Sequence, residues 1–141
     1  MTARQEAKMN NKNRILVVDD DEVVRWSYLR SLQSISRNVE AACDGEEALQ
    51  TMEQSPCDVV LLDLRMPGQD GMTVLRTIKQ KWPESEVVII TGYPTVDSAK
   101  EALRLGAYDY VAKPVAPLDV ISVADRAMAH KQWALRRASE N

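Results

Sequence analysis

Three short runs of branched apolar residues most constrain how this chain can fold. The runs are residues 15–18, 59–62 and 87–90, with the sequences ILVV, VVLL and VVII. Because every position in each run is apolar, rather than every second one, each run predicts a strand covered on both faces. Strands of that kind occur almost only in parallel sheets with helices on both sides, so the sequence indicates an α/β protein.

Two weaker candidate strands and a set of helical segments complete the pattern. Residues 38–42 and 107–111 mix apolar and polar side chains, as expected nearer the edges of a sheet. Helical segments are expected to follow the strands, beginning near Val23, Asp44, Met72, Thr95 and Pro117. In the first of them, apolar residues recur with helical spacing at Val23, Trp26, Leu29, Leu32 and Ile35.

Strand–helix units repeated in this way imply right-handed crossovers between neighbouring parallel strands. The expected fold is α/β: a single doubly wound five-stranded parallel sheet, (βα)5, with the flavodoxin-like strand order 2-1-3-4-5. At 141 residues the chain has room for one domain. We expect a lead-in without regular structure over residues 1–13, the domain over residues 14–130, and a helical extension or linker over residues 131–141.

The charge balance excludes some classes of function. The 18 basic and 21 acidic residues give a net charge of −3, which argues against direct nucleic-acid binding by this segment. No apolar stretch approaches the roughly 20 residues that span a bilayer, and the polar N-terminus lacks the apolar core of a signal peptide. A cytoplasmic protein without a membrane partner is expected.

The two cysteines and the single histidine point to no zinc site and no disulfide framework. Cys43 and Cys57 lie in or beside apolar runs and are expected to be buried, reduced thiols. His130 is expected on the polar side of the last helix, exposed to solvent and without a partner for general-base chemistry.

Polar residues follow four of the expected strands at the point where each strand ends. They are Asp19, Asp20, Asp63, Thr91 and Lys113. The carboxyl ends of parallel strands share one edge of the sheet, so these side chains are expected to meet there. Carboxylates gathered in one pocket repel each other, and a hard divalent cation, Mg²⁺ or Mn²⁺, is the natural compensation. An acidic nucleophile, a metal, a lysine and a hydroxyl donor are what phosphoryl transfer requires.

The motifs VVDDD, LLDLRMPGQDG, VIITGY and YDYVAKP follow the order and spacing of the response-regulator receiver family, and the resemblance covers roughly residues 13–131. It implies that Asp63 is the phosphoacceptor. It also implies that Asp20 is a direct metal ligand, with Asp19 acting largely through water. The backbone carbonyl of Arg65 would be the remaining protein ligand of the metal.

The same resemblance implies a conformational switch. Thr91 corresponds to the hydroxyl that turns inward to bond the phosphoryl group, and Lys113 to the lysine that pairs with that group. Tyr110 corresponds to the aromatic residue that swings inward after the hydroxyl. Lys113–Pro114 corresponds to a cis peptide bond of the family. The readout surface would comprise the helix that begins near Thr95, the strand through Tyr110 and the last helix.

Three further positions are expected to modulate the site. Gly92 lets a backbone N–H approach a bound anion closely. Arg65, two residues after the acceptor, and Tyr93, two residues after Thr91, flank the path of an attacking water. In the receiver family these two positions tune autodephosphorylation. A bulky pair predicts shielding and a long-lived phosphoryl state.

The resemblance also implies partners. The phosphoryl donor would be a sensor histidine kinase or a phosphotransfer protein, and the chain would catalyse only its own phosphorylation and dephosphorylation. The stretch TGYPTVDSAKEALRLGAYDYVAKP most resembles receivers attached to AAA+ transcription activators. A controlled transcriptional output and a phosphorylation-dependent homodimer are therefore expected.

Four alternatives remain open. A stand-alone receiver would act as a phosphorylation-gated protein-binding module. A haloacid-dehalogenase-type phosphatase needs a second Asp two residues after the nucleophile, where this chain has Arg65, which cannot act as a general acid. A flavin-binding flavodoxin-like protein needs a hydroxyl- and glycine-rich loop after the first strand, where this chain has three aspartates. A degenerate receiver would lack the acidic pair, acceptor, Thr and Lys found here.

Overall fold

In the computed structural model, which describes residues 13–140, five parallel strands form one sheet in the order β2-β1-β3-β4-β5. This confirms the predicted fold class and strand order. The strands are β1 (Asn13–Val18), β2 (Arg37–Ala42), β3 (Val59–Leu62), β4 (Glu86–Thr91) and β5 (Asp109–Ala112). The helices between and after them are α2 (Glu22–Leu32), α3 (Gly45–Gln54), α4 (Gly71–Lys81), α5 (Val96–Arg104) and α6 (Pro117–Glu140).

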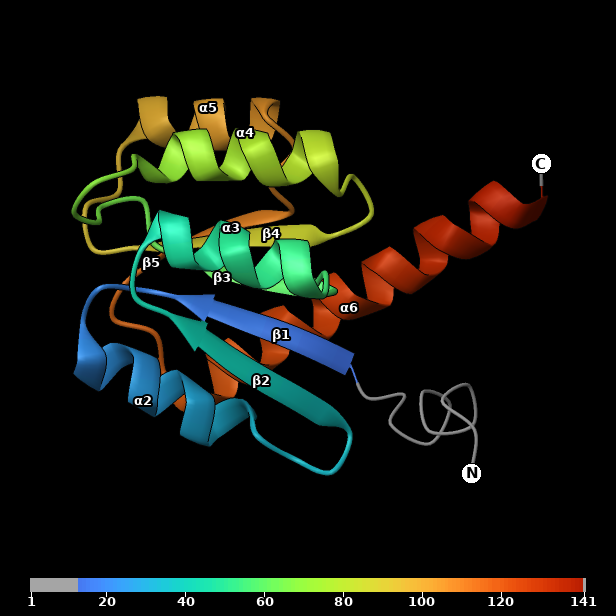
Figure 1. Ribbon diagram of the computed structural model, residues 1–141, viewed down its shortest axis with the longest axis horizontal. Helices are drawn as coiled ribbons and strands as arrows, with labels where there is room; N and C mark the ends of the chain where they lie inside the picture. Colours follow the sequence, from blue (N-terminus) through green and yellow to red (C-terminus); the bar gives the residue numbers. More distant parts are fainter. Residues whose placement is uncertain (1–12, 141) are drawn as a thin grey trace.

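The sheet lies between two helical layers, with α3, α4 and α5 on one face and α2 and α6 on the other (Figure 1). Alternate residues of each central strand point to opposite layers. In β1, Leu16 and Val18 pack with the α3–α5 layer, whereas Ile15 and Val17 pack with α2 and α6. This double burial is the reason that the central strands are apolar at every position.

The two weaker strands lie where the mixed pattern placed them, at the edges of the sheet. Most residues of β2 and β5 are only partly buried, whereas β3 and β4 are buried throughout. Strand β1 begins at Asn13, the last residue of the expected lead-in. The rest of that lead-in, residues 1–12, lies outside the described residues.

Side-chain caps begin the helices after β2 and β4, as predicted. The carboxylate of Asp44 accepts a hydrogen bond from the backbone N–H of Glu47 at the start of α3. Thr95 does the same for Ser98 at the start of α5. Pro117 is the first residue of α6, where its missing N–H leaves no bond unmade. These caps set the points at which the chain turns back over the sheet.

The apolar face predicted for the first helix is wrong in part. Helix α2 ends at Leu32, and Ile35 lies beyond it with 92% of its surface exposed. Trp26 is also exposed, whereas Tyr28 and Leu32 are buried. The physical reason is that three residues turn a helix by about 300°, so a set spaced by three drifts around its surface. Tyr28 and Leu32, four residues apart, mark the face that packs on the sheet.

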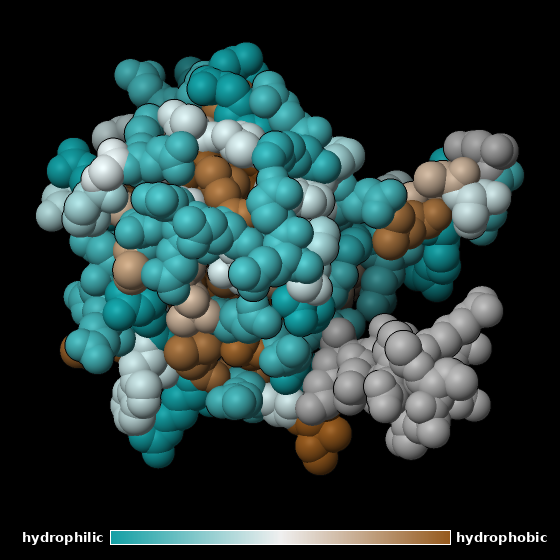
Figure 2. All heavy atoms as spheres, in the orientation of Figure 1, coloured by the Kyte–Doolittle hydropathy of each residue, from teal (hydrophilic) through white to brown (hydrophobic). Residues whose placement is uncertain are grey.

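Helix α6 runs without a break from Pro117 to Glu140, and every residue of the helix after Lys131 is exposed. Its last turns extend away from the body of the domain (Figure 1). Among the described residues no helix is both long and apolar enough to cross a membrane. The face shown in Figure 2 is largely hydrophilic, and its hydrophobic side chains lie in small separate areas.

Two expectations about single residues are wrong. Cys43 is exposed rather than buried, because it directly follows the edge strand β2. Cys57 is buried as expected, and burial raises the pKa of its thiol to about 11. His130 is exposed, as expected, but it does have a partner: its Nδ1 lies 2.9 Å from a carboxylate oxygen of Glu86. That contact arises because α6 passes the amino end of β4, a neighbour 44 residues earlier in the chain.

Candidate functional site

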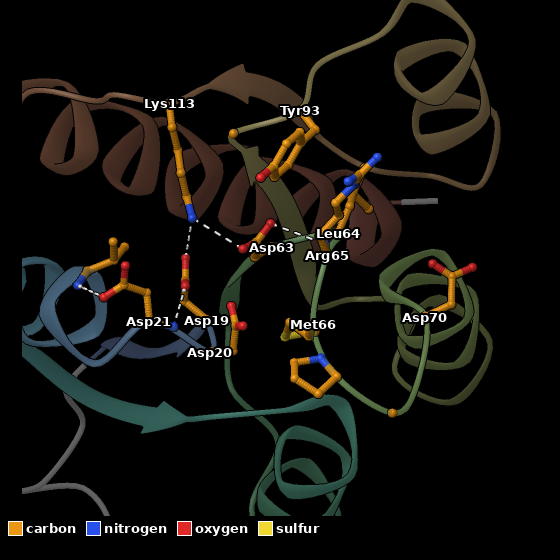
Figure 3. Close-up of a pocket in the computed structure, with 14 residues that line it drawn as sticks. Asp19, Asp20, Asp21, Asp63, Leu64, Arg65, Met66, Asp70, Tyr93 and Lys113 are labelled. Atoms are coloured by element: carbon orange, nitrogen blue, oxygen red, sulfur yellow. Dashed lines mark hydrogen bonds and ion pairs between the residues drawn. The ribbon is translucent and has the colours of Figure 1, made fainter.

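A polar pocket opens at the carboxyl edge of the sheet, where the loops after β1, β3, β4 and β5 meet (Figure 3). Most of the predicted site residues line it: Asp19, Asp20, Asp63, Arg65, Gly92, Tyr93 and Lys113. Thr91 lies beside this pocket in a smaller one that also contains Arg65 and Tyr93. The parallel sheet therefore brings residues from four strand ends to one place, as the strand-end pattern predicts.

The ammonium of Lys113 lies between two carboxylates. Its Nζ is 2.6 Å from an oxygen of Asp19 and 3.2 Å from an oxygen of Asp63 (Figure 3). Burial alone would lower the pKa of Lys113, but the bonds and charges of these two aspartates outweigh it and raise that pKa above its ordinary value. The lysine is therefore firmly charged at neutral pH.

A backbone hydrogen bond holds Lys113 in this position. Its N–H donates to the carbonyl oxygen of Thr91 at 2.8 Å, which ties the end of β5 to β4. This bond fixes the point from which the lysine side chain reaches across the strand ends toward β1 and β3. The peptide bond between Lys113 and Pro114 is cis, as the resemblance implies.

Asp63 is a buried carboxylate of the site with a raised pKa. It follows β3, with only 6% of its surface exposed. Burial raises the pKa of Asp63, and the hydrogen bond from the Arg65 N–H at 3.2 Å and the charge of Lys113 offset this only in part. A buried carboxylate that lines an open pocket has the chemistry of a nucleophile.

Carboxylate oxygens of Asp19, Asp20 and Asp63 all lie within 4.8 Å of one another. Hard oxygen ligands at this spacing fit a divalent cation such as Mg²⁺, which keeps several waters and needs few protein ligands. Asp19 and Asp63 are buried, whereas Asp20 is exposed toward the pocket. The donor set therefore fits the metal that the strand-end pattern predicted.

The loop after β1 is held from several sides. The N–H of Asp21 donates to Oδ1 of Asp19 at 2.9 Å, and the Asp21 carboxylate caps α2. In addition, the side-chain Nη1 of Arg25 donates to the backbone carbonyl oxygen of Asp19 at 2.8 Å. Arg25 was not found by reasoning from the sequence. The available signal was its place one turn after the N-cap, where a helical side chain points back toward the strand end.

The two predicted switch hydroxyls both bond to the loop between β4 and α5. Thr91 is fully buried, and its Oγ1 accepts from the N–H of Tyr93 at 3.1 Å. The hydroxyl of Tyr110 accepts from the N–H of Thr95 at 3.2 Å and lies 2.5 Å from Oγ of Ser98. Tyr110 lies outside the acidic pocket, so the structure does not bring it to the carboxylates.

A search with protein-family models identifies this region directly. The model of the response regulator receiver domain matches residues 15–125, which include four of the five strands and four of the five described helices in full, with most of β1 and the start of α6. The matched region contains all the residues of the acidic pocket described above.

Curated relatives point the same way. The chain is 37% identical to the DNA-binding transcriptional regulator NtrC of Klebsiella pneumoniae over 82% of this chain and 25% of that protein. It is 35% identical to a putative response regulator, NtrX-like, of Rickettsia felis over 71% of this chain and 22% of that protein. The chain thus spans about a quarter of the length of these relatives.

Solved structures agree on the fold. NtrX from Brucella abortus, in complex with ADP, superposes with a TM-score of 0.86 at 31% identity, covering 92% of this chain and 30% of that one. The isolated receiver domain of the same NtrX superposes with a TM-score of 0.76 at 35% identity, covering 82% of this chain and 98% of that one.

Proposed function

Because the chain belongs to the response regulator receiver family, as a receiver domain of the NtrC/NtrX type, we propose that Asp63 accepts a phosphoryl group in a metal-dependent step. The donor is a phosphohistidine of a sensor histidine kinase or of a phosphotransfer protein. The observation that carries this assignment is the ammonium of Lys113 between Asp19 and Asp63, beside a third carboxylate on Asp20.

The carboxylates of Asp19, Asp20 and Asp63, with the backbone carbonyl of Arg65, would hold the divalent cation. When bound, Mg²⁺ or Mn²⁺ neutralises charge on the phosphoryl oxygens during transfer. Asp63 supplies the nucleophile: one of its oxygens bonds to phosphorus as the phosphorus–nitrogen bond of the donor breaks. The histidine keeps the electron pair, and the product is an acyl phosphate on Asp63.

Lys113 supplies the fixed positive charge of the site. In the unphosphorylated protein its ammonium offsets the charges of Asp19 and Asp63, whose oxygens are 2.6 Å and 3.2 Å away. Once Asp63 carries a phosphoryl group, the same ammonium is within reach of a phosphoryl oxygen and stabilises its charge. Gly92, which lines the pocket without a side chain, lets its backbone N–H approach the group.

Phosphorylation would change the conformation of the loop between β4 and α5. The Thr91 hydroxyl, which now accepts from the Tyr93 N–H, would turn inward and donate to a phosphoryl oxygen. Tyr110 then leaves its bonds to Thr95 and Ser98 and fills the vacated space. The change would be a population shift between two packings of α5, β5 and α6.

The surface formed by α5, β5 and α6 would control a transcriptional output domain in the cytoplasm. The same surface would mediate a phosphorylation-dependent homodimer. The relatives that support this are named as transcriptional and response regulators, and this chain matches about a quarter of their length. The second candidate, a stand-alone receiver that binds a partner when phosphorylated, uses the same site chemistry and differs only in what the switch surface contacts.

Incubation with acetyl phosphate or a beryllofluoride mimic, with and without Mg²⁺, tests the proposal by mass and by oligomeric state. We expect a Mg²⁺-dependent phosphoryl adduct that is absent in Asp63→Asn, and a larger oligomer in the modified protein. The matched control is Asp97→Asn, an exposed aspartate in the first turn of α5, which should keep the adduct. The absence of any adduct in the unmodified sequence would overturn the proposal.

A further inference from the structure

We propose that Arg25 is a positioning residue for the metal site: it fixes the peptide group between Asp19 and Asp20 and thereby aims the carboxylate of Asp20 into the pocket. This role rests on the proposed function, because it concerns the metal on which phosphoryl transfer depends. Arg25 itself would contact neither the metal nor the phosphoryl group.

One hydrogen bond connects Arg25 to the loop that carries the aspartates. Nη1 of Arg25 donates to the backbone carbonyl oxygen of Asp19 at 2.8 Å. That carbonyl belongs to the peptide group that joins Asp19 to Asp20. Because a peptide group is planar, holding its oxygen also fixes the direction of the following N–H and Cα. The guanidinium therefore restrains the place from which the Asp20 side chain departs.

Asp20 needs such a restraint more than the other two aspartates do. The carboxylate of Asp19 is held by Lys113 and by the N–H of Asp21, and that of Asp63 by Lys113 and the N–H of Arg65. Within residues 13–140 the side chain of Asp20 makes no hydrogen bond, and the residue is exposed. Its backbone is thus the main determinant of where its oxygens lie before metal binds.

The position of Arg25 on α2 explains how it reaches this carbonyl. Asp21 caps the helix, and the N–H of Arg25 donates to the Asp21 carbonyl at 3.0 Å, in the first turn. Side chains on a helix lean toward its N-terminus, so a long side chain one turn inside the helix lies over the preceding strand end. An arginine at this position can span the gap between α2 and the end of β1.

The electrostatic and the positioning effects of Arg25 predict opposite changes in cation affinity when Arg25 is removed. The guanidinium is a positive charge beside an acidic site, so its removal by Coulomb's law alone would strengthen cation binding. If the hydrogen bond to Asp19 preorganises the ligands, removal weakens binding instead. Partners of this kind, which orient metal ligands without touching the metal, typically change affinity by about 10- to 100-fold.

The test measures Mn²⁺ affinity by electron paramagnetic resonance in the unphosphorylated protein. We expect Arg25→Ala to bind Mn²⁺ at least about tenfold more weakly than the unmodified chain and Arg25→Lys, which keeps a donor, to recover part of the loss. The matched control is Arg30→Ala, which removes the same charge from the exposed side of α2, where the Arg30 guanidinium carbon lies 5.2 Å from the Trp26 ring centroid.

Unchanged or tighter Mn²⁺ binding by Arg25→Ala, or an equal loss in Arg30→Ala, would overturn the positioning role. Should Arg25→Ala fail to fold by circular dichroism, Arg25→Gln decides by the same criterion, because its shorter neutral side chain cannot reach the carbonyl. The phosphoryl adduct of the unmodified chain separates the two proposals. If the adduct forms and Arg25→Ala binds Mn²⁺ normally, only the role of Arg25 falls; if the unmodified chain binds no Mn²⁺, both fall.

Discussion

The guanidinium carbon of Arg65 lies 4.0 Å from the centroid of the Tyr93 ring. Arg65 comes from the loop after β3 and Tyr93 from the loop after β4, so the contact closes the gap between two strand ends (Figure 3). A cation–π pair at an exposed site contributes about 0.5–1 kcal/mol. Both residues line the pocket beside Asp63, so we expect the pair to shield an acyl phosphate there from attacking water.

Loss of this pair should shorten the phosphoryl lifetime. In Arg65→Ala with Tyr93→Ala, we expect phosphorylated Asp63 to decay about five- to tenfold faster, which corresponds to roughly 1–1.4 kcal/mol in the barrier. The decay is measured by mass after acetyl phosphate is removed. The control is the pair Trp133 and Arg137 on α6, a similar contact far along the chain, whose double alanine variant should decay normally. Equal lifetimes in all three proteins would remove the shielding role.

The perturbed pKa of Asp63 predicts that its charge destabilises the metal-free fold. Because burial raises this pKa above the ordinary value of 3.8, the folded state binds more protons than the unfolded state between the two pKa values. Stability therefore falls as the pH rises through that window and stays lower at neutral pH. We expect Asp63→Asn, which cannot ionise, to have a higher Tm than the unmodified chain at pH 7 without metal.

Two further melts, at low pH and with excess Mg²⁺, check the Asp63→Asn prediction. The advantage should vanish below the unfolded pKa, where Asp63 is neutral in both states. Excess Mg²⁺ should stabilise the unmodified chain more than the variant, because only the folded acidic site binds the metal. Thermal melts by circular dichroism measure both effects. A lower Tm for Asp63→Asn at neutral pH without metal would contradict the assigned direction of the pKa shift.

Gly71 is the first residue of α4 and packs against the backbone of Asp63 and Leu64, just after β3. A Cβ at this position would lie 2.5 Å from Cα of Leu64 and 2.8 Å from the carbonyl oxygen of Asp63. Since both neighbours are backbone atoms, the loop must move, and we expect Gly71→Ala to lose about 1–3 kcal/mol of stability. We also expect it to take up the phosphoryl group more slowly.

Denaturant unfolding and the acetyl phosphate assay measure the two effects of Gly71→Ala. Gly92→Ala is the stability control, because its nearest neighbour would be the Lys113 side chain at an ordinary 3.8 Å. We expect that variant to stay within about 0.5 kcal/mol of the unmodified chain. Equal stability of the Gly71 variant would show that the loop yields without strain.

Tyr110 holds the N-cap residue of α5 through its hydroxyl, which accepts from the N–H of Thr95. In Tyr110→Phe the ring remains but that acceptor is gone, and we expect a stability loss of about 0.5–1.5 kcal/mol and faster amide exchange at Thr95. Hydrogen exchange by NMR measures the latter. Tyr108→Phe is the control, since no hydrogen bond to its hydroxyl occurs among residues 13–140. Unchanged exchange at Thr95 would mean that Tyr110 does not restrain the loop.

The sequence predicted best the positions that follow from a residue's place relative to a strand. The apolar runs predicted the buried strands, and the positions at the strand ends predicted that Asp19, Asp63 and Lys113 lie together in one pocket. The sequence predicted helices and contacts between distant elements less well. The face of α2 was misassigned because helical spacing alone leaves the buried side open, and His130 was expected to lack the partner that it has in Glu86.

Sequence alone determined the strands, their burial and the end of the sheet at which the polar residues gather, because these depend on neighbouring residues and on the common direction of parallel strands. Tertiary structure decided the individual contacts: Lys113 with Asp19, 94 residues away, Arg25 with the Asp19 carbonyl, and Arg65 over Tyr93. Such contacts depend on how crossovers and helices pack in three dimensions, and a side chain's reach across a gap has no period in the sequence.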